Sequence, residues 1–185
     1  MSGTLVVISS PSGGGKNTVM RELIARIRNT ARVVTTTTRA QRAGEVDGMD
    51  YHFIGRSVFE QKIVDGEFVE YNEYAGNLYG LQKVHLHDAL NTYTFVYYQA
   101  DVHGKQSLDR LGIPHISVFL LPESLGVLEE RVVQRGGVSD ESLAMRLDIA
   151  REEVKMADAY DLAIVNKNGA LQEVVEEIMR FLGQE

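Results

Sequence analysis

The stretch from Thr4 to Met20, TLVVISSPSGGGKNTVM, constrains the fold more than any other part of the chain. An apolar, β-branched run over Leu5–Ile8 ends in a turn of serine, proline and glycine. Lys16 follows this turn, and after it comes a segment whose apolar residues have helical spacing. A strand, a glycine-rich loop, a lysine and a helix together build a cradle for phosphate groups. The glycines of Gly13–Gly15 let consecutive backbone N–H groups converge on one anion, and the helix N-terminus and the Lys16 ammonium add positive charge.

This loop departs from the strict pattern G-x-x-x-x-G-K-[ST] at two positions. Ser10 stands where the pattern has glycine, and Asn17 stands where it has a hydroxyl residue. Neither change touches the glycines or the lysine, so we expect the cradle to be retained. Taken alone, the stretch is also compatible with a glycine-rich turn followed by a surface lysine.

Composition narrows the class of protein. A length of 185 residues predicts one domain, and 44% hydrophobic with 24% charged residues is typical of a globular protein. The absence of cysteine excludes disulfides and thiolate metal sites. A net charge of −7 argues against nucleic acid or an anionic membrane as a partner, so the cations that bind a polyphosphate must be gathered locally.

The sequence also lacks the features of membrane insertion and export. No apolar run approaches the roughly 18 residues of a membrane span. The segment Met1–Ile8 lacks the basic start of a signal peptide. We therefore expect a cytoplasmic protein.

Short apolar segments alternate with segments of helical periodicity along most of the chain. This alternation predicts an α/β fold with a parallel sheet covered by helices on both faces. The expected core strands are Leu5–Ile8, Thr94–Tyr98, Ile116–Leu121 and Leu162–Val165, and the expected helices are Thr18–Ile27, Gly104–Leu111, Ser124–Val133, Ser139–Met156 and Ala170–Leu182.

The region from Arg32 to Asn91 breaks this rhythm. Short alternating segments rich in threonine, tyrosine and phenylalanine predict a small mixed or antiparallel insertion between the first and second core strands. A second irregular segment, Arg135–Asp140, joins two helices and could move. Both would lie at the carboxyl ends of the core strands, where ligands bind in open α/β sheets. The insertion is expected to contain strands at Val33–Thr38, Tyr51–Ile54, Phe68–Tyr74 and Asn77–Leu81, and a helix at Ser57–Val64.

The insertion holds side chains suited to a second phosphate and to a base. Arg39 and Arg42, with Tyr51 beyond them, can grip a phosphate through paired guanidinium groups, although a polar surface loop is the alternative. Glu70 lies in an apolar and aromatic strand. An ionised carboxylate only accepts hydrogen bonds, which suits the N1–H and 2-amino donors of guanine and not the edge of adenine. An outward-facing strand glutamate is the alternative.

The later part of the chain adds a carboxylate and three arginines. Asp101 follows the second core strand, where it could serve a metal–water shell or a substrate, or cap the next helix. Arg131 and Arg135 lie near the end of one helix, and Arg146 lies on the next. These arginines could close over phosphates or form salt bridges with nearby glutamates.

The order of these motifs resembles that of the guanylate kinase family. The match runs from SPSGGGK through TTTTR-x-x-R-x-GE-x-DG-x-DYHF and GEF-x-EYNEY-x-GNLYG to Asp101-x-x-Gly104, R-x-x-x-RGG-x-SDES-x-x-x-R and YDLAIVN, and it spans nearly the whole chain. The resemblance implies a nucleotide-binding transferase of purine nucleotide metabolism, a kinase that uses ATP and Mg²⁺ to phosphorylate GMP, and dGMP, to the diphosphate.

The resemblance implies a fold as well. We expect a P-loop, three-layer parallel sheet with helices on both faces, a small mixed α+β insertion that binds the nucleoside monophosphate, and a short lid. Within one domain, the core would comprise residues 1–31, 92–134 and 158–185, the GMP-binding insertion 32–91 and the lid 135–157. The partners would be ATP and GMP, and the chain would be a monomer or a homodimer.

Roles follow from the same resemblance. The ATP-binding residues would be Ser12, Gly13, Gly14, Gly15, Lys16, Asn17, Thr18, Arg131 and Asn166. The GMP-binding residues would be Thr35, Arg39, Arg42, Tyr51, Glu70, Tyr79 and Asp101, with Glu70 and Asp101 facing guanine. The catalytic residues would be Lys16, Arg39, Arg42, Arg135 and Arg146, and Asn17 would meet the metal largely through water.

Three positions differ from the residues common in the family. Members commonly have serine or threonine at Asn17, threonine or serine at Leu81, where it donates to guanine O6, and aspartate at Gln99. An amide oxygen can replace a hydroxyl on a hard cation, and Gln82 or Thr36 could donate in place of Leu81. We interpret these changes as weakened or retuned activity.

Two other functions stay open. One is a non-catalytic guanylate-kinase-like binding module, against which the retained Lys16 and candidate arginines argue. The other is a kinase of another small phosphate, such as a ribose bisphosphate, against which Glu70 argues.

Overall fold

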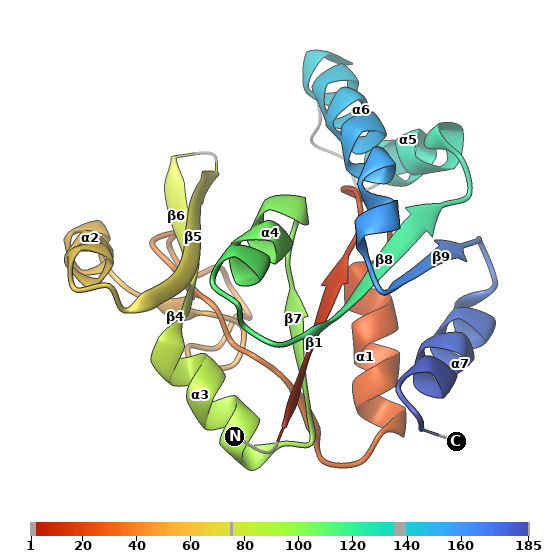
Figure 1. Ribbon diagram of the computed structural model, residues 1–185. Helices are drawn as coiled ribbons and strands as arrows, with labels where there is room; N and C mark the ends of the chain where they lie inside the picture. Colours follow the sequence, from red (N-terminus) through yellow and green to blue (C-terminus); the bar gives the residue numbers. More distant parts are fainter. Residues whose placement is uncertain (1–2, 75, 135–139, 185) are drawn as a thin grey trace.

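The computed structural model describes residues 3–74, 76–134 and 140–184, which form an α/β fold with two sheets (Figure 1). The main sheet is parallel, in the order β2-β7-β1-β8-β9, and the second sheet is mixed, in the order β4-β3-β6-β5. The strands are β1 Thr4–Ser9, β2 Thr30–Arg32, β3 Thr36–Thr37, β4 His52–Phe53, β5 Phe68–Tyr74, β6 Asn77–Gln82, β7 Phe95–Gln99, β8 Ile116–Pro122 and β9 Leu162–Asn166. The helices are α1 Lys16–Arg26, α2 Arg56–Val64, α3 Lys83–Thr92, α4 Val102–Arg110, α5 Leu125–Gln134, α6 Asp140–Lys155, the 3-10 helix η1 Ala157–Ala159 and α7 Leu171–Phe181.

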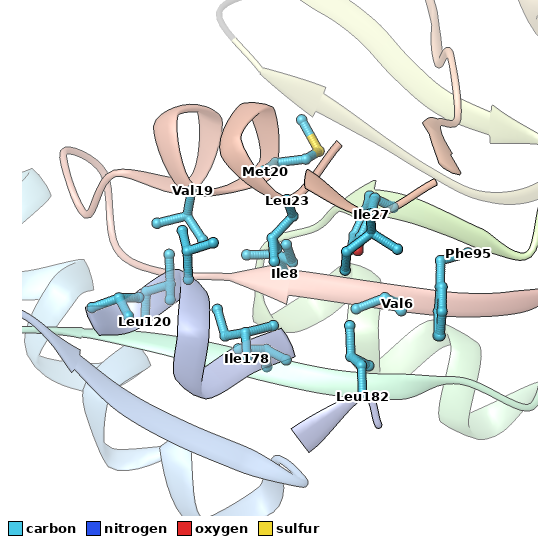
Figure 2. Packing of buried hydrophobic residues seen from close by; sticks show 14 of the residues in the cluster. Val6, Ile8, Val19, Met20, Leu23, Ile27, Phe95, Leu120, Ile178 and Leu182 are labelled. Carbon is cyan, nitrogen blue, oxygen red and sulfur yellow. The ribbon is translucent and has the colours of Figure 1, made fainter. Parts of the chain in front are cut away.

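Helices cover both faces of the main sheet, as the sequence predicts. Successive side chains of a strand point to opposite faces, so a strand buried on both sides is continuously apolar. On one face, Val6 and Ile8 of β1 pack with α1 and α7, and Figure 2 shows Leu23 and Ile178 converging on Ile8. On the other face, Leu5 and Val7 pack with side chains of α3 and α4.

The edge strand β2 was not expected from the sequence. Thr30–Arg32 pairs in parallel with β7, with Ala31 opposite Val96. The segment TAR has no apolar run that would mark it as a strand, since an edge strand of three residues needs little burial. The single strand expected over Val33–Thr38 is wrong. Val33 belongs to the core of the main sheet, whereas only Thr36–Thr37 form a strand, in the second sheet.

Helix α3 is the second element that the sequence prediction missed. It begins directly after β6 and packs Leu86 and Leu90, one turn apart, against the main sheet. Its other positions are largely polar, so its apolar stripe is narrow. Because α3 covers the main sheet, the last part of the region expected as an insertion lies against the core.

Figure 1 shows β5, β6 and α2 on one side of the main sheet and α5 and α6 on the opposite side. The loops that follow β1 and β7 lie between these two groups, at the carboxyl ends of neighbouring strands. Such an edge is where open α/β sheets bind ligands. Within the described ranges, no helix has the length and apolarity needed to cross a bilayer.

Candidate functional site

The loop between β1 and α1 folds as a cradle of backbone N–H groups. Gly13 and Gly15 adopt φ angles of 90° and 91°, in the left-handed region that favours glycine. Gly14 packs so closely that an added Cβ would lie 2.4 Å from Ser10 Oγ. Ser10 itself is buried, and its hydroxyl donates to the carbonyl of Pro11 at 3.0 Å. The serine in place of the usual glycine is therefore accommodated without disturbing the cradle.

Lys16 begins α1, and its ammonium donates to the Ser10 carbonyl across the loop. Asn166, at the end of β9, fixes the loop from the other side. Its buried amide donates to the Gly14 carbonyl at 2.8 Å, and an added Cβ at Gly15 would approach its Nδ2 to 2.5 Å. The cradle is thus held by contacts from the start of α1 and from the end of β9.

Because of this packing, Gly15→Ala should destabilise the protein. Alanine at φ 91° costs about 1–2 kcal/mol, and the close approach to Asn166 adds to that cost. Denaturant unfolding should show the loss. Gly126→Ala is the matched control, because Gly126 lies in α5 with no atom closer than 3.7 Å to an added Cβ. That control should gain roughly 0.5–1 kcal/mol from helix propensity, and equal effects of the two changes would contradict the prediction.

A cavity of about 450 Å³, here called the insertion cavity, lies between the second sheet and the end of β7. Several residues expected to bind GMP line it together, although they come from distant parts of the sequence. These are Thr35, Tyr51, Glu70, Tyr79 and Asp101, and Lys16, Asn72, Tyr98 and Gln99 join them.

Glu70 is a half-buried acceptor in the insertion cavity. The Tyr98 hydroxyl donates to its Oε1. Burial raises the pKa of the Glu70 carboxyl; the Tyr98 hydrogen bond opposes this, and the charge of Asp101 adds to the rise. The carboxylate is therefore partly removed from water and has one fixed donor, and it can accept further N–H donors from a ligand in the cavity.

Arg39 lies beside the insertion cavity, behind Tyr51. Its guanidinium is 5.5 Å from the Tyr51 ring centroid, and its Nη2 pairs with Glu45 Oε1 at 2.7 Å. The hydrogen bond from Arg39 lowers the pKa of Glu45. The Arg42 side chain is exposed. Its backbone N–H donates to Glu45 Oε2 at 2.8 Å, and its carbonyl accepts from the Glu45 N–H at 3.1 Å. Neither arginine is among the residues that line the cavity, so only Arg39 is held close to it.

Two further cavities continue from the first. The loop cavity, of about 340 Å³, is lined by Ser12, Gly13, Gly14, Gly15, Lys16, Asn17, Asp101 and Glu153. The β9 cavity, of about 480 Å³, is lined by Gly13, Gly15, Thr18, Arg131, Asn166 and Asn168. Lys16 and Asp101 line both the insertion and loop cavities, and Gly13 and Gly15 line both the loop and β9 cavities. The three cavities therefore adjoin one another across the edge of the sheet, and together they are here called the groove.

The arginines expected near the phosphates lie in different places. Arg131 lines the β9 cavity, and its Nη2 donates to Asn168 Oδ1 at 2.6 Å. Arg146 reaches the rim of the loop from α6, with its Nη1 3.4 Å from Ser12 Oγ. Arg135 lies outside the described residues. Two separate helices thus bring guanidinium groups to the groove.

The helix-cap interpretation of Asp101 is confirmed, whereas its role toward a metal–water shell or a substrate stays a prediction. Its Oδ1 accepts from the Gly104 N–H at 2.8 Å, which caps α4, and the residue also lines the groove. Asn17 accepts a hydrogen bond from Gln99 Nε2. Among the described residues, no group of three or more histidine, cysteine, aspartate or glutamate side chains could hold a metal ion. Oxygen donors for a hydrated cation are nevertheless present in the loop cavity, from Asn17, Asp101 and Glu153.

The structure places in or beside the groove several residues that the sequence analysis missed. Tyr98, Glu45 and Glu153 each contact or face an expected site residue, and Asn72 lies two residues from Glu70 on β5. Only the Glu70–Asn72 spacing could have been found locally, since residues two apart on a strand share a face.

The expected substitutes for Leu81 do not face the groove. Gln82 Nε2 donates to Thr36 Oγ1 at 2.6 Å, and both residues are buried. Neither lines the insertion cavity, whereas Thr35 and Asn72 do.

Comparison with known proteins agrees with this geometry. The sequence matches the guanylate kinase family profile over residues 2–185. It is 39% identical over 184 residues to guanylate kinase of Streptococcus thermophilus, covering 99% of this chain and 87% of that protein. It is 40% identical over 177 residues to guanylate kinase of Nostoc sp., covering 94% and 88%.

Solved structures extend the comparison. The crystal structure of guanylate kinase from Anaplasma phagocytophilum aligns with a TM-score of 0.74 at 29% identity, covering 98% of this chain and 85% of that chain. A shikimate kinase from Bacteroides thetaiotaomicron, at 14% identity and a TM-score of 0.55, shares the fold, with 97% of this chain and 98% of that chain covered. Because the family profile matches residues 2–185 and the relatives are 39% and 40% identical over nearly the whole chain, the chain belongs to the guanylate kinase family.

Proposed function

We propose that this chain transfers the γ-phosphoryl group of ATP to GMP, and to dGMP, giving ADP and the corresponding diphosphate. The observation that carries the proposal is the series of adjoining cavities that makes up the groove. It places a half-buried carboxylate suited to guanine, a phosphate cradle with Lys16, and a cavity lined by Arg131 and Asn166 next to one another. Two nucleotides bound in its two ends would meet with their phosphates at the cradle.

In this proposal, different parts of the groove bind different parts of the two nucleotides. Lys16 and the backbone N–H groups of the loop hold the phosphates of ATP, and the β9 cavity receives its adenosine. Thr35, Tyr51 and Tyr79 seat GMP with Arg39 and Arg42, and Glu70 and Asp101 accept from the guanine edge. The insertion supplies the acceptor site, and residues 135–157, which carry Arg135 and Arg146, act as the lid.

The transfer needs little covalent work from the protein. The acceptor phosphate is already a nucleophile, so no general base is required, and catalysis rests on in-line positioning and on compensation of charge. Lys16 compensates charge on the ATP phosphates, and Arg39 and Arg42 orient the acceptor. Lid closure brings Arg135 and Arg146 to the phosphates and expels water that would otherwise hydrolyse ATP.

Mg²⁺ belongs to this proposal as the companion of ATP, where it would neutralise charge on the phosphates. Mg²⁺ keeps several waters and binds through few protein oxygens together with phosphates. The oxygen donors of Asn17, Asp101 and Glu153 in the loop cavity fit such a hydrated ion.

A coupled assay for nucleoside diphosphate formation tests the proposal. We expect GMP and dGMP to be phosphorylated and AMP, IMP and ribose phosphates to react far more slowly. Calorimetric titration with ATP and GMP separates an enzyme from a binding module, because both nucleotides should bind. Phosphorylation of a ribose phosphate in preference to GMP, or no binding of either nucleotide, would reject the proposal.

The pH dependence of GMP use tests the role of Tyr98. The guanine edge needs the ionised Glu70, so affinity for GMP falls as the pH drops through the pKa of Glu70. The Tyr98 hydrogen bond lowers that pKa, so Tyr98→Phe should raise it and move the acid loss of kcat/KM for GMP to higher pH.

Tyr97→Phe is the matched control for this measurement. Tyr97 is the neighbouring buried tyrosine of β7, and it packs on the opposite face, against α1 and α7. The phosphate of GMP also titrates in the acid range, but it does so equally for each variant. A Tyr98→Phe profile that matches those of Tyr97→Phe and the parent protein would contradict the assignment.

A further inference from the structure

We propose that Asn17 and Gln99 form an uncharged amide pair that holds the phosphates of ATP directly, so that ATP binding by this chain depends little on Mg²⁺. The inference rests on the proposed function, because it assumes that ATP phosphates occupy the loop cavity. It concerns two residues that differ together from the usual P-loop pattern and that contact one another in the fold.

The geometry places the pair where phosphates would lie. Asn17 follows Lys16 at the start of α1 and lines the loop cavity. Gln99 is the last residue of β7, opposite Ile8 of β1, and it lines the insertion cavity. Gln99 Nε2 donates to Asn17 Oδ1, although the two residues are 82 positions apart. The pair thus joins the two cavities beside Lys16.

In P-loop enzymes, these two places normally hold a metal ion. A hydroxyl after the loop lysine and a carboxylate from a nearby strand bind Mg²⁺, which in turn binds the phosphates. A carboxylate at this place repels the phosphates when the metal is missing. A cation between the carboxylate and the phosphates makes their close approach favourable. Nucleotide binding is therefore coupled to metal binding.

An amide pair removes that coupling. Neither amide carries a charge, so neither repels a phosphate. Each side chain has two N–H donors, and only one N–H of Gln99 is needed for the contact with Asn17 Oδ1. The remaining donors can bond phosphate oxygens in the absence of a cation.

Calorimetry with the non-hydrolysable analogue β,γ-imido-ATP tests the proposal. The measured quantity is the ratio of its Kd in EDTA to its Kd in Mg²⁺. We expect a ratio below about tenfold for the parent protein, because the amides need no cation to hold phosphates. For Gln99→Asp and Asn17→Thr/Gln99→Asp, we expect the ratio to rise at least about tenfold, mainly through weaker binding in EDTA. Binding is measured because Mg²⁺ also neutralises charge during transfer.

Control variants separate local from general effects. Gln106→Asp adds the same charge on α4 at an exposed position outside the three cavities, and its ratio should match that of the parent. Thermal melting checks folding, and Gln99→Glu replaces Gln99→Asp if the latter fails to fold.

The outcomes distinguish the two proposals. A parent ratio above about tenfold, or an unchanged ratio in the variants that place a carboxylate at Gln99, overturns the amide-pair inference and leaves the kinase function standing. Failure of the analogue to bind in either condition overturns both. A low parent ratio that rises in the carboxylate variants and stays low in Gln106→Asp supports the inference.

Discussion

Replacement of Lys16 by methionine is expected to lower kcat by about 10³-fold while the fold stays intact. Methionine keeps the length and apolar stem of lysine and removes only the ammonium. A unit charge about 4 Å from a phosphate oxygen is worth ~4 kcal/mol at an effective dielectric constant near 20, which corresponds to roughly three decades in rate. In the structure this ammonium lies on the wall shared by the insertion and loop cavities, where both sets of phosphates would meet.

Lys83→Met is the matched control for this prediction. Lys83, like Lys16, is the first residue of a helix that follows a strand, but it lies on α3 and its Nζ donates to the Gly66 carbonyl at 2.6 Å. It lines none of the three cavities of the groove. We expect its turnover to stay within about twofold of the parent, as is usual for a surface substitution. Near-normal turnover of Lys16→Met, with an unchanged melting temperature, would remove Lys16 from the mechanism.

The main sheet could be predicted because its central strands are buried on both faces. Burial on both sides produces a continuous apolar run, as in β1 and β8, and such runs are visible in the sequence without knowledge of the neighbours. The edge strand β2 and the narrow stripe of α3 carry no such signal. Their structure depends on backbone pairing with β7 and on two leucines that fit a surface formed by other strands.

The candidate site also has a part that could be predicted from the sequence and a part that could not. The phosphate cradle is local, so its glycines and Lys16 could be recognised in one short stretch. The partners that tune the site are distant in sequence. Tyr98 is 28 residues from Glu70, and Gln99 is 82 residues from Asn17. The first contact joins the two sheets and the second joins β7 to α1, and no local sequence pattern specifies that these elements meet.

Glu70→Gln is expected to lower kcat/KM for GMP by about 10²- to 10³-fold and to leave ATP affinity unchanged. A carboxylate accepts from both N1–H and the 2-amino group of guanine, whereas an amide accepts one such bond and opposes the other donor with its own N–H. Losing a bond to a charged acceptor costs ~1.5–3 kcal/mol, and leaving a buried donor unpaired adds a similar penalty. Because Glu70 lies in the insertion cavity and not in the β9 cavity, its replacement should weaken the use of GMP and not the binding of ATP.

The preference for GMP over IMP gives the sharpest measurement of this effect. IMP keeps the N1–H donor and lacks the 2-amino group, so it loses less than GMP when Glu70 becomes an amide. The GMP-to-IMP ratio of kcat/KM should therefore fall in Glu70→Gln. Glu73→Gln is the matched control, since Glu73 lies on the same strand but pairs at the surface with Arg56 at 3.3 Å. Exposed pairs contribute about 0–1 kcal/mol, so that variant should keep the ratio of the parent. An undiminished preference for GMP in Glu70→Gln would show that another group reads the 2-amino edge of the base.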